Sequence, residues 1–186
     1  MSLFRWLLTF LGFPLGGWLA AVVVGPVHDP AAAAGAGAVA GAVIGLVQWW
    51  ALRPMVGWRW PAVTAAGMAA GSAVAIVVTG AATTPGALAL GGLVSGAVVG
   101  ALQGLALQWG LRAAAVWAAS VGLSWAAGWF VTGNVIVDAE RGYAVFGSSG
   151  AVAATVLTGL VLRRMLGPAG KRTVPPAASA TPGFAR

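Results

Sequence analysis

Six long apolar runs restrict the fold of this chain more than any other feature. They cover approximately residues 6–24, 34–52, 60–78, 88–108, 114–132 and 144–165, and each is close to the roughly 20 residues that a helix needs to cross a bilayer. Only 7% of the residues are charged and the mean hydropathy is +0.92, whereas soluble domains carry about 25% charged residues. The sequence therefore predicts an all-α integral membrane bundle of six transmembrane helices.

The first run follows Arg5, as in a signal peptide, but it is longer than the usual apolar segment of such a peptide and glycines interrupt it. We therefore expect it to be a true span. After residue 165 the composition changes to Gly, Pro, Ala, Ser and Thr with two basic residues. This predicts a transmembrane domain over residues 1–166 and a disordered, basic, Pro/Ala-rich cytoplasmic tail over 167–186.

The charged residues divide unequally between the two sides of such a bundle. If the N-terminus is inside, only Arg141 among the ten basic residues falls outside, together with all three acids, Asp29, Asp138 and Glu140. Cytoplasmic loops carry an excess of Lys and Arg, so both termini are expected in the cytoplasm. The Ala- and Gly-rich usage is typical of a GC-rich bacterium and favours the plasma (inner) membrane. Because topology accounts for the net charge of +7, no nucleic-acid partner is predicted.

Five tryptophans lie at the inner ends of the predicted spans. Indole rings prefer the headgroup region of a membrane, so we expect these residues to form an interfacial belt. They are Trp49, Trp50, Trp58, Trp60 and Trp109.

The chain also contains an internal pattern. Trp6, Trp60 and Trp117 are each followed eleven residues later by a glycine, and the segment 41–48 resembles 96–103 and, more weakly, 150–157. We expect three tandem parallel helix-hairpin repeats, at about 4–54, 58–112 and 113–166. In this alignment Leu157 occupies the position of Gln48 in the first copy. Low complexity is the competing explanation, because Ala, Gly and Val alone produce spurious matches.

Glycines at four-residue spacing mark the faces on which these helices are expected to pack. Small residues let helix backbones approach closely in lipid, where contact depends on dispersion. The predicted packing positions are Gly37, Gly41, Gly45, Gly67, Gly71, Gly92, Gly96, Gly100 and Gly104.

Gln48, Gln103 and Gln108 are the most polar side chains expected within the spans. A buried amide is costly without a partner, so interhelical hydrogen bonding is the first interpretation. A polar ring lining a solute path is the second. Hydroxyl groups such as those of Ser72 and Thr155 are expected to bond to the preceding turn of their own helices and to need no other role.

The sequence offers little for catalysis. No ionisable residue falls in the middle of a predicted span, and there is no cysteine and a single histidine. His28, Asp29, Asp138 and Glu140 share the outer side, but their spacing matches no metal motif, and whether they converge stays open. We therefore expect no enzyme, no metal and no cofactor.

Three functional hypotheses follow. The first is a tightly packing structural or assembly component of a membrane complex or homo-oligomer, with the bilayer and possible membrane proteins as partners. The second is a small channel or membrane-embedded transporter subunit for an uncharged or apolar solute. A continuous polar path past Gln48 and Gln103 would favour it, and a close-packed centre would oppose it. The third is the binding of a lipid or pigment between the helices.

Overall fold

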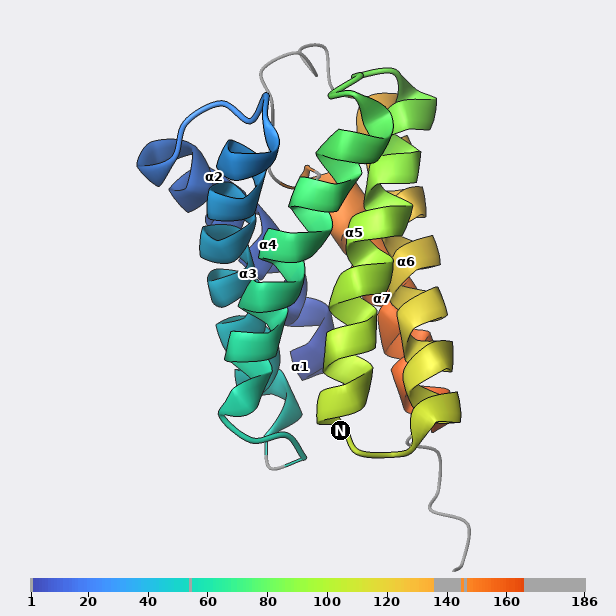
Figure 1. Cartoon of the computed structure of the whole chain (residues 1–186). Coiled ribbons are helices and arrows are strands. Elements are labelled where there is room, and N and C mark those ends of the chain that lie inside the picture. Colours follow the sequence, from blue (N-terminus) through green and yellow to red (C-terminus); the bar gives the residue numbers. More distant parts are fainter. Residues whose placement is uncertain (1, 54, 136–144, 146, 166–186) are drawn as a thin grey trace, which may run out of the picture.

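The computed structural model describes residues 2–53, 55–135, 145 and 147–165, and every regular element in these residues is helical (Figure 1). The elements are α1 (Leu3–Leu7), η1 (Leu8–Leu11), α2 (Gly12–Val23), α3 (Pro30–Leu52), α4 (Arg59–Thr79), α5 (Pro85–Ala106), α6 (Leu111–Gly133) and α7 (Ser148–Met165).

Five helical segments are long and apolar enough to cross a membrane. They are the combined segment Leu3–Val23 and the helices α3, α4, α5 and α6. The sixth predicted span corresponds to α7, which has 18 residues and carries Arg163 and Arg164 in its last turn, so its apolar part is shorter. The predicted tail beyond residue 166 lies outside the described residues. The helices indicate a membrane protein, as the sequence predicts.

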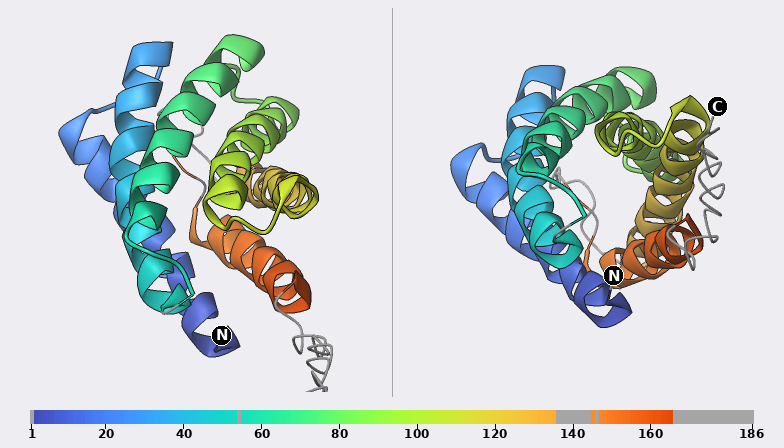
Figure 2. Two further views of the ribbon diagram at one scale, coloured as in Figure 1. Left: turned by 60° about the horizontal axis from the view of Figure 1, so that its bottom comes forward. Right: turned by 90° about the horizontal axis from the view of Figure 1, so that it is seen from below.

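Consecutive helices pack side by side and the bundle closes on itself. Each of α2 to α6 contacts the next helix along the chain, and α1 and η1 contact α7. Seen along the bundle, the helices therefore form a ring in which α7 lies beside α1 (Figure 2). The first and last helices of the ring are thus neighbours although they are far apart in the sequence.

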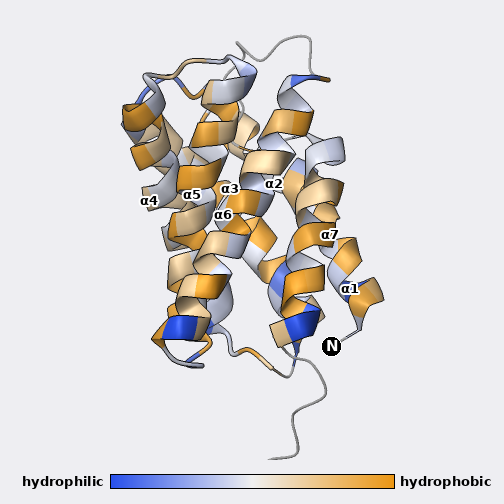
Figure 3. Ribbon diagram, turned by 90° about the vertical axis from the view of Figure 1, so that its right-hand side faces the viewer, coloured by the Kyte–Doolittle hydropathy of each residue, from blue (hydrophilic) through white to orange (hydrophobic). Residues whose placement is uncertain are grey.

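The arginines gather at one end of this ring, where hydrophilic residues interrupt otherwise apolar helices (Figure 3). We call this the basic end, defined by Arg5, Arg53, Arg59, Arg112, Arg163 and Arg164. The opposite end contains the connections from α2 to α3, which carries His28 and Asp29, and from α4 to α5.

The predicted tryptophan belt is partly wrong. The Arg53 guanidinium lies 3.9 Å from the ring centroid of Trp49, that of Arg5 lies 5.6 Å from Trp50, and Trp58 is 74% exposed. Trp60, however, is only 2% exposed and belongs to the core. It lies in the first turn of α4, on the face that packs against α3. A position near the end of a predicted span therefore does not place a tryptophan at the membrane interface.

Local sequence explains where two of the helices bend or begin. Pro14 lacks an N–H group, and in a regular α-helix its ring would clash with the carbonyl of Phe10, which favours the tighter 3₁₀ turn at Leu8–Leu11. Asp29 caps α3 by accepting hydrogen bonds from the backbone N–H groups of Ala31 and Ala32, at 2.8 and 2.9 Å. Pro30 follows at the first helical position, where no N–H partner is needed.

Candidate functional site

Two glutamines from α3 and α5 meet inside the bundle, toward the basic end. Gln103 Nε2 donates to Gln48 Oε1 at 3.1 Å and to Thr64 Oγ1 at 2.9 Å. Trp60 Nε1 donates to Gln48 Oε1 at 3.2 Å, and Trp117 Nε1 donates to Gln103 Oε1 at 3.1 Å. We call these five residues the amide cluster. It links four helices, α3, α4, α5 and α6.

The amide cluster is almost completely shielded. Gln48 is 7% exposed and Gln103 is 2% exposed, and Thr64, Trp60 and Trp117 are buried as well. A buried hydrogen-bonding group left without a partner costs about 1–3 kcal/mol. The four bonds between side chains therefore make the arrangement specific, because moving one helix would leave several buried groups unpaired at once.

A third buried tryptophan extends this pattern to the N-terminal helix. Trp6 Nε1 donates to the backbone carbonyl of Thr155 in α7 at 3.0 Å, and the Trp6 ring packs edge-on against Trp117 with centroids 6.5 Å apart. Trp6, Trp60 and Trp117 are the residues that the sequence pattern aligned, and each is 1–2% exposed. The sequence marked their spacing but gave no sign that they donate hydrogen bonds.

The three predicted glutamine positions have different outcomes. Gln48 and Gln103 are brought together, whereas Gln108 is exposed in the connection after α5 and has a left-handed backbone, with φ +55°. Helix α5 ends at Ala106, so the predicted span was drawn two residues too long. Gln108 thus lies outside α5 and apart from the contact between Gln48 and Gln103.

In α7, the residue that the sequence pattern aligns with Gln48 is not one of the buried positions. Leu157 is 42% exposed, while its neighbour Thr158 is 6% exposed. The buried positions of α7 match those of α5 at an offset of 55 residues, so Thr158 has the position in the burial pattern of α7 that Gln103 has in α5. An Ala- and Gly-rich segment tolerates such a slip in sequence alignment because neighbouring residues look alike.

All nine predicted packing glycines lie against a neighbouring helix of the same chain. A Cβ atom added to any of them would come within 3.0 Å of an atom on that neighbour. At Gly100, for example, it would lie 2.7 Å from Ala118 Cα, and at Gly41 it would lie 2.8 Å from Ala65 Cα. The glycine faces are therefore filled within the chain itself.

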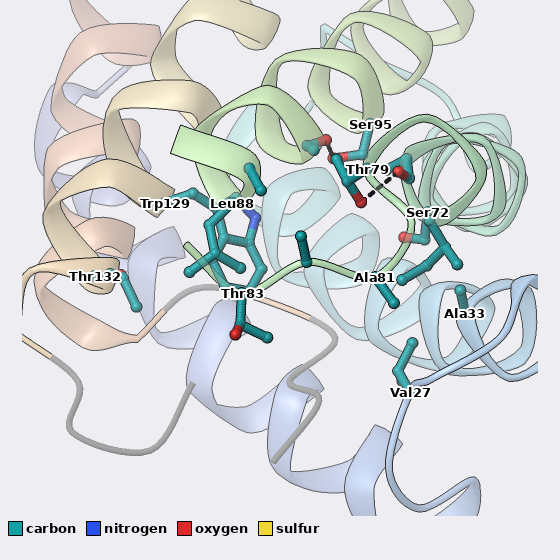
Figure 4. A pocket seen from close by; sticks show the side chains of 16 residues that line it. Val27, Ala33, Ser72, Thr79, Ala81, Thr83, Leu88, Ser95, Trp129 and Thr132 are labelled. Atoms are coloured by element: carbon teal, nitrogen blue, oxygen red, sulfur yellow. Dashed lines mark hydrogen bonds between the residues drawn. The ribbon is translucent and has the colours of Figure 1, made fainter. Parts of the chain in front are cut away.

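A pocket lies toward the end of the bundle that is opposite the basic end, between α3, α4, α5 and α6 (Figure 4). We call it the end pocket. Its volume is about 100 Å³, and its walls come from the outer turns of these helices and from the connection between α4 and α5. The side chains that define it are those of Val27, Ile76, Leu88 and Trp129 with the hydroxyl residues Ser72, Thr79, Thr83, Ser95 and Thr132.

The hydroxyl groups of the end pocket are not equivalent. Ser95 Oγ donates to the Gly91 carbonyl and Thr79 Oγ1 to the Ala75 carbonyl, both at 2.8 Å, as expected for helical hydroxyls. Thr132 Oγ1 accepts from the backbone N–H of Gly147 at 3.1 Å. Ser72 Oγ makes no hydrogen bond to the described residues, so it is free to bond to a molecule in the pocket.

The end pocket was not found from the sequence. In the part of the chain that the structure describes, no charged or histidine side chain lines it, and its small and hydroxyl residues are spread over four helices with no recognisable spacing. The sequence predicts a bond from the Ser72 hydroxyl to the preceding turn of its own helix. Among the described residues the structure contains no such bond.

The possible metal ligands are not brought together in the part of the chain that the structure describes. His28 and Asp29 are exposed, and Asp29 is used as a helix cap. Asp138 and Glu140 lie outside the described residues. Among the residues that are described, no group of three or more His, Cys, Asp or Glu side chains is close enough to hold a metal ion.

Comparison with known proteins finds no family model, no curated protein and no solved structure that matches this chain.

Proposed function

We propose that this chain is an integral membrane protein that binds a small, uncharged and mainly apolar molecule in the end pocket. The observation that carries the proposal is the pocket itself, about 100 Å³ in volume, lined by apolar side chains and a few hydroxyl groups. Ligand sites are typically concave and apolar with a small number of placed polar groups. A closed cavity of about 150 Å³ holds a benzene ring, so a pocket of about 100 Å³ takes a smaller molecule, or the end of a ligand whose remainder lies outside the pocket.

The glycine faces give little support to the hypothesis that the chain is an assembly component of a larger complex. Glycines at four-residue spacing suggested a partner, but those residues contact helices of the same chain. They give no separate reason to expect a complex or an oligomer. Binding between helices, the third sequence hypothesis, accounts for the pocket directly.

The amide cluster argues against passage of a solute. Gln48 and Gln103 bond to each other and to indole groups, and the cavity beside them has a volume of only about 10 Å³. This favours a pocket that ends inside the bundle. Because no titratable side chain among the described residues lines the pocket, the proposed role is binding rather than catalysis.

We also propose the three parallel hairpins, on the basis of equivalent contacts. A Cβ atom on Gly41 would meet Met68 of α4, and one on Gly96 would meet Trp125 of α6. These partners are 57 residues apart, and Trp60 and Trp117 have the same separation. The contact between α3 and α4 and the contact between α5 and α6 are thus made by residues at equivalent positions of the sequence pattern.

The first hairpin fits this scheme although its segment between the tryptophan and the first packing glycine is one residue shorter than in the second hairpin. Gly12 follows Trp6 by six positions, whereas Gly67 follows Trp60 by seven, yet the two glycines face Ile44 and Val99, which are 55 apart. A 3₁₀-helix rises about 2.0 Å per residue against about 1.5 Å in an α-helix. The four residues of η1 therefore cover slightly more than the length of five α-helical residues.

The positive-inside rule supports the proposed orientation. With the basic end in the cytoplasm of a bacterial cell, the end pocket opens on the outer side of the plasma membrane. A ligand would then enter from outside the cell or from the outer leaflet.

Thermal unfolding of the purified protein in mild detergent tests the proposal, with benzyl alcohol as the probe. A ligand that binds only the folded state raises Tm in a concentration-dependent way. Gly91→Leu places a side chain in the pocket, because a Cβ atom there would have only ordinary contacts, at 3.8 Å, with Ala75 and Thr79. This variant should lose the Tm response.

Gly86→Leu is the matched control. Gly86 lies in the same helix, no atom lies within 4 Å of its added Cβ, and it does not line the pocket. Aromatic alcohols also partition into micelles, so the difference between the two variants is decisive. Equal Tm responses in both variants would refute binding in the end pocket.

A further inference from the structure

A second, much smaller cavity lies beside the amide cluster and shares no lining residue with the end pocket. Its volume is about 10 Å³, and its polar lining consists of Gln48, Gln103, Thr155 and Thr158. The rings of Trp6 and Trp117 are among its apolar walls. A space of about 10–15 Å³ by this measure holds one water molecule.

Three polar atoms of this lining have unused hydrogen-bonding capacity. Thr155 Oγ1 is buried without a partner, and the residue is 3% exposed. Gln48 accepts two bonds at Oε1, but its Nε2 donates none within the described residues. Gln103 Oε1 accepts one bond, from Trp117, and retains a second lone pair.

We infer that this cavity is a binding site for one internal water molecule. The water accepts a hydrogen bond from Gln48 Nε2, donates one to Gln103 Oε1, and bonds to Thr155 Oγ1. Three hydrogen bonds is the usual number for a buried water. The donors and acceptors balance, since Gln103 Nε2 already spends its two protons on Gln48 and Thr64.

The sequence of α7 explains why the space exists at this point. Thr158 has the position in the burial pattern of α7 that Gln103 has in α5, but its side chain is shorter and carries no amide group. Its hydroxyl donates to the Ala154 carbonyl at 2.8 Å and does not reach toward the cluster. A water molecule supplies the polar group that a third glutamine would have provided.

The inferred water also has a structural consequence. The amide cluster joins α3, α4, α5 and α6 by side-chain bonds, whereas Trp6 bonds to the backbone of α7. A water held between Gln48, Gln103 and Thr155 connects α7 to α3 and α5.

The first test is the thermal stability of Thr155→Val, in which the hydroxyl is replaced by a methyl group of similar size. If the water is present, the variant loses one of its three bonds and Tm falls. If the cavity is dry, the variant removes an unpaired buried hydroxyl and Tm rises, because such a group is destabilising. The two models thus predict shifts of opposite sign.

Thr79→Val is the control for the exchange itself. The Thr79 hydroxyl bonds only to the Ala75 carbonyl of its own helix, and the change keeps the β-branched shape. A decrease in Tm for Thr155→Val that exceeds the change in the control supports the water site. A smaller decrease, no change or an increase overturns it.

A second measurement uses the unmodified protein and does not depend on a variant. With methyl-labelled Thr and Ala in detergent micelles, NMR should detect a nuclear Overhauser effect between water and the methyl groups of Thr155 and Ala154, which line the cavity. The buried methyl of Ala40, which does not line the cavity, should show none. A resolved Thr155 methyl signal without a water contact would overturn the inference.

Discussion

The amide cluster and the end pocket lie on the same four helices, α3, α4, α5 and α6, and differ in how completely their side chains fill the space. Toward the basic end, tryptophan rings and glutamine amides close the interior with hydrogen bonds. Toward the opposite end, small and hydroxyl residues leave about 100 Å³ open. The two regions thus differ in the size of the side chains that fill the space between the helices.

Helix α5 contains both situations within three turns. A Cβ atom on Gly100 would lie 2.7 Å from the backbone of Ala118, whereas one on Gly91 would lie 3.8 Å from its nearest neighbours, Ala75 and Thr79. Glycine is required by close backbone approach at the first position and not at the second. The difference between the two regions is therefore open to direct test.

The largest expected effect is at Gly100. Gly100→Ala should destabilise the folded protein by about 3 kcal/mol, because the added methyl group forces α5 away from α6 and overpacking of this kind costs about 1–3 kcal/mol or more. Gly91→Ala should be neutral or should stabilise by up to about 1 kcal/mol, through higher helix propensity. Unfolding in mixed detergent micelles measures both.

A similar loss of stability in the two variants would contradict the comparison. It would mean that the glycines of α5 act through backbone flexibility at both ends, and not through the close contact that is confined to the faces packed against α6.

An intermediate effect is expected at Gln103. Gln103→Leu removes three side-chain hydrogen bonds and leaves Trp117 Nε1 buried without an acceptor. We expect a loss of about 2 kcal/mol, on the basis of about 1–3 kcal/mol for one unsatisfied buried group. Gln108→Leu is the matched control, because Gln108 is exposed, and it should change stability by less than about 0.5 kcal/mol. Equal effects would show that the amide cluster does not stabilise the bundle.

The sequence predicted the helical membrane bundle because its strongest signal is the length of the apolar runs, which depends on no tertiary detail. It also selected Gln48 and Gln103, since an amide in an apolar helix needs a partner. It did not identify Trp60 as that partner. A tryptophan near a span end looks the same whether its ring faces lipid or the core, and only the orientation of the helix decides this.

The end pocket could not be predicted for a related reason. A pocket is the volume that side chains fail to fill, and that volume depends on the distances between helices to a fraction of an ångström. Ser72 and Ser95 are both small hydroxyl residues facing the same space. Only the structure distinguishes the hydroxyl that bonds to its own helix from the one that does not.

This distinction gives the smallest expected effect. Ser72→Ala should leave stability unchanged within about 0.5 kcal/mol, because Ser72 is not fully buried and its hydroxyl makes no bond to the described residues. If a ligand hydroxyl bonds to Ser72, the same change should weaken benzyl alcohol binding by about 2- to 10-fold, the equivalent of about 0.5–1.5 kcal/mol for one hydrogen bond. Ser95→Ala should keep the original affinity, because the Ser95 hydroxyl is already bonded to the Gly91 carbonyl. Equal affinities in the two variants would show that the pocket binds through its apolar surface alone, and that the free hydroxyl of Ser72 does not orient the ligand.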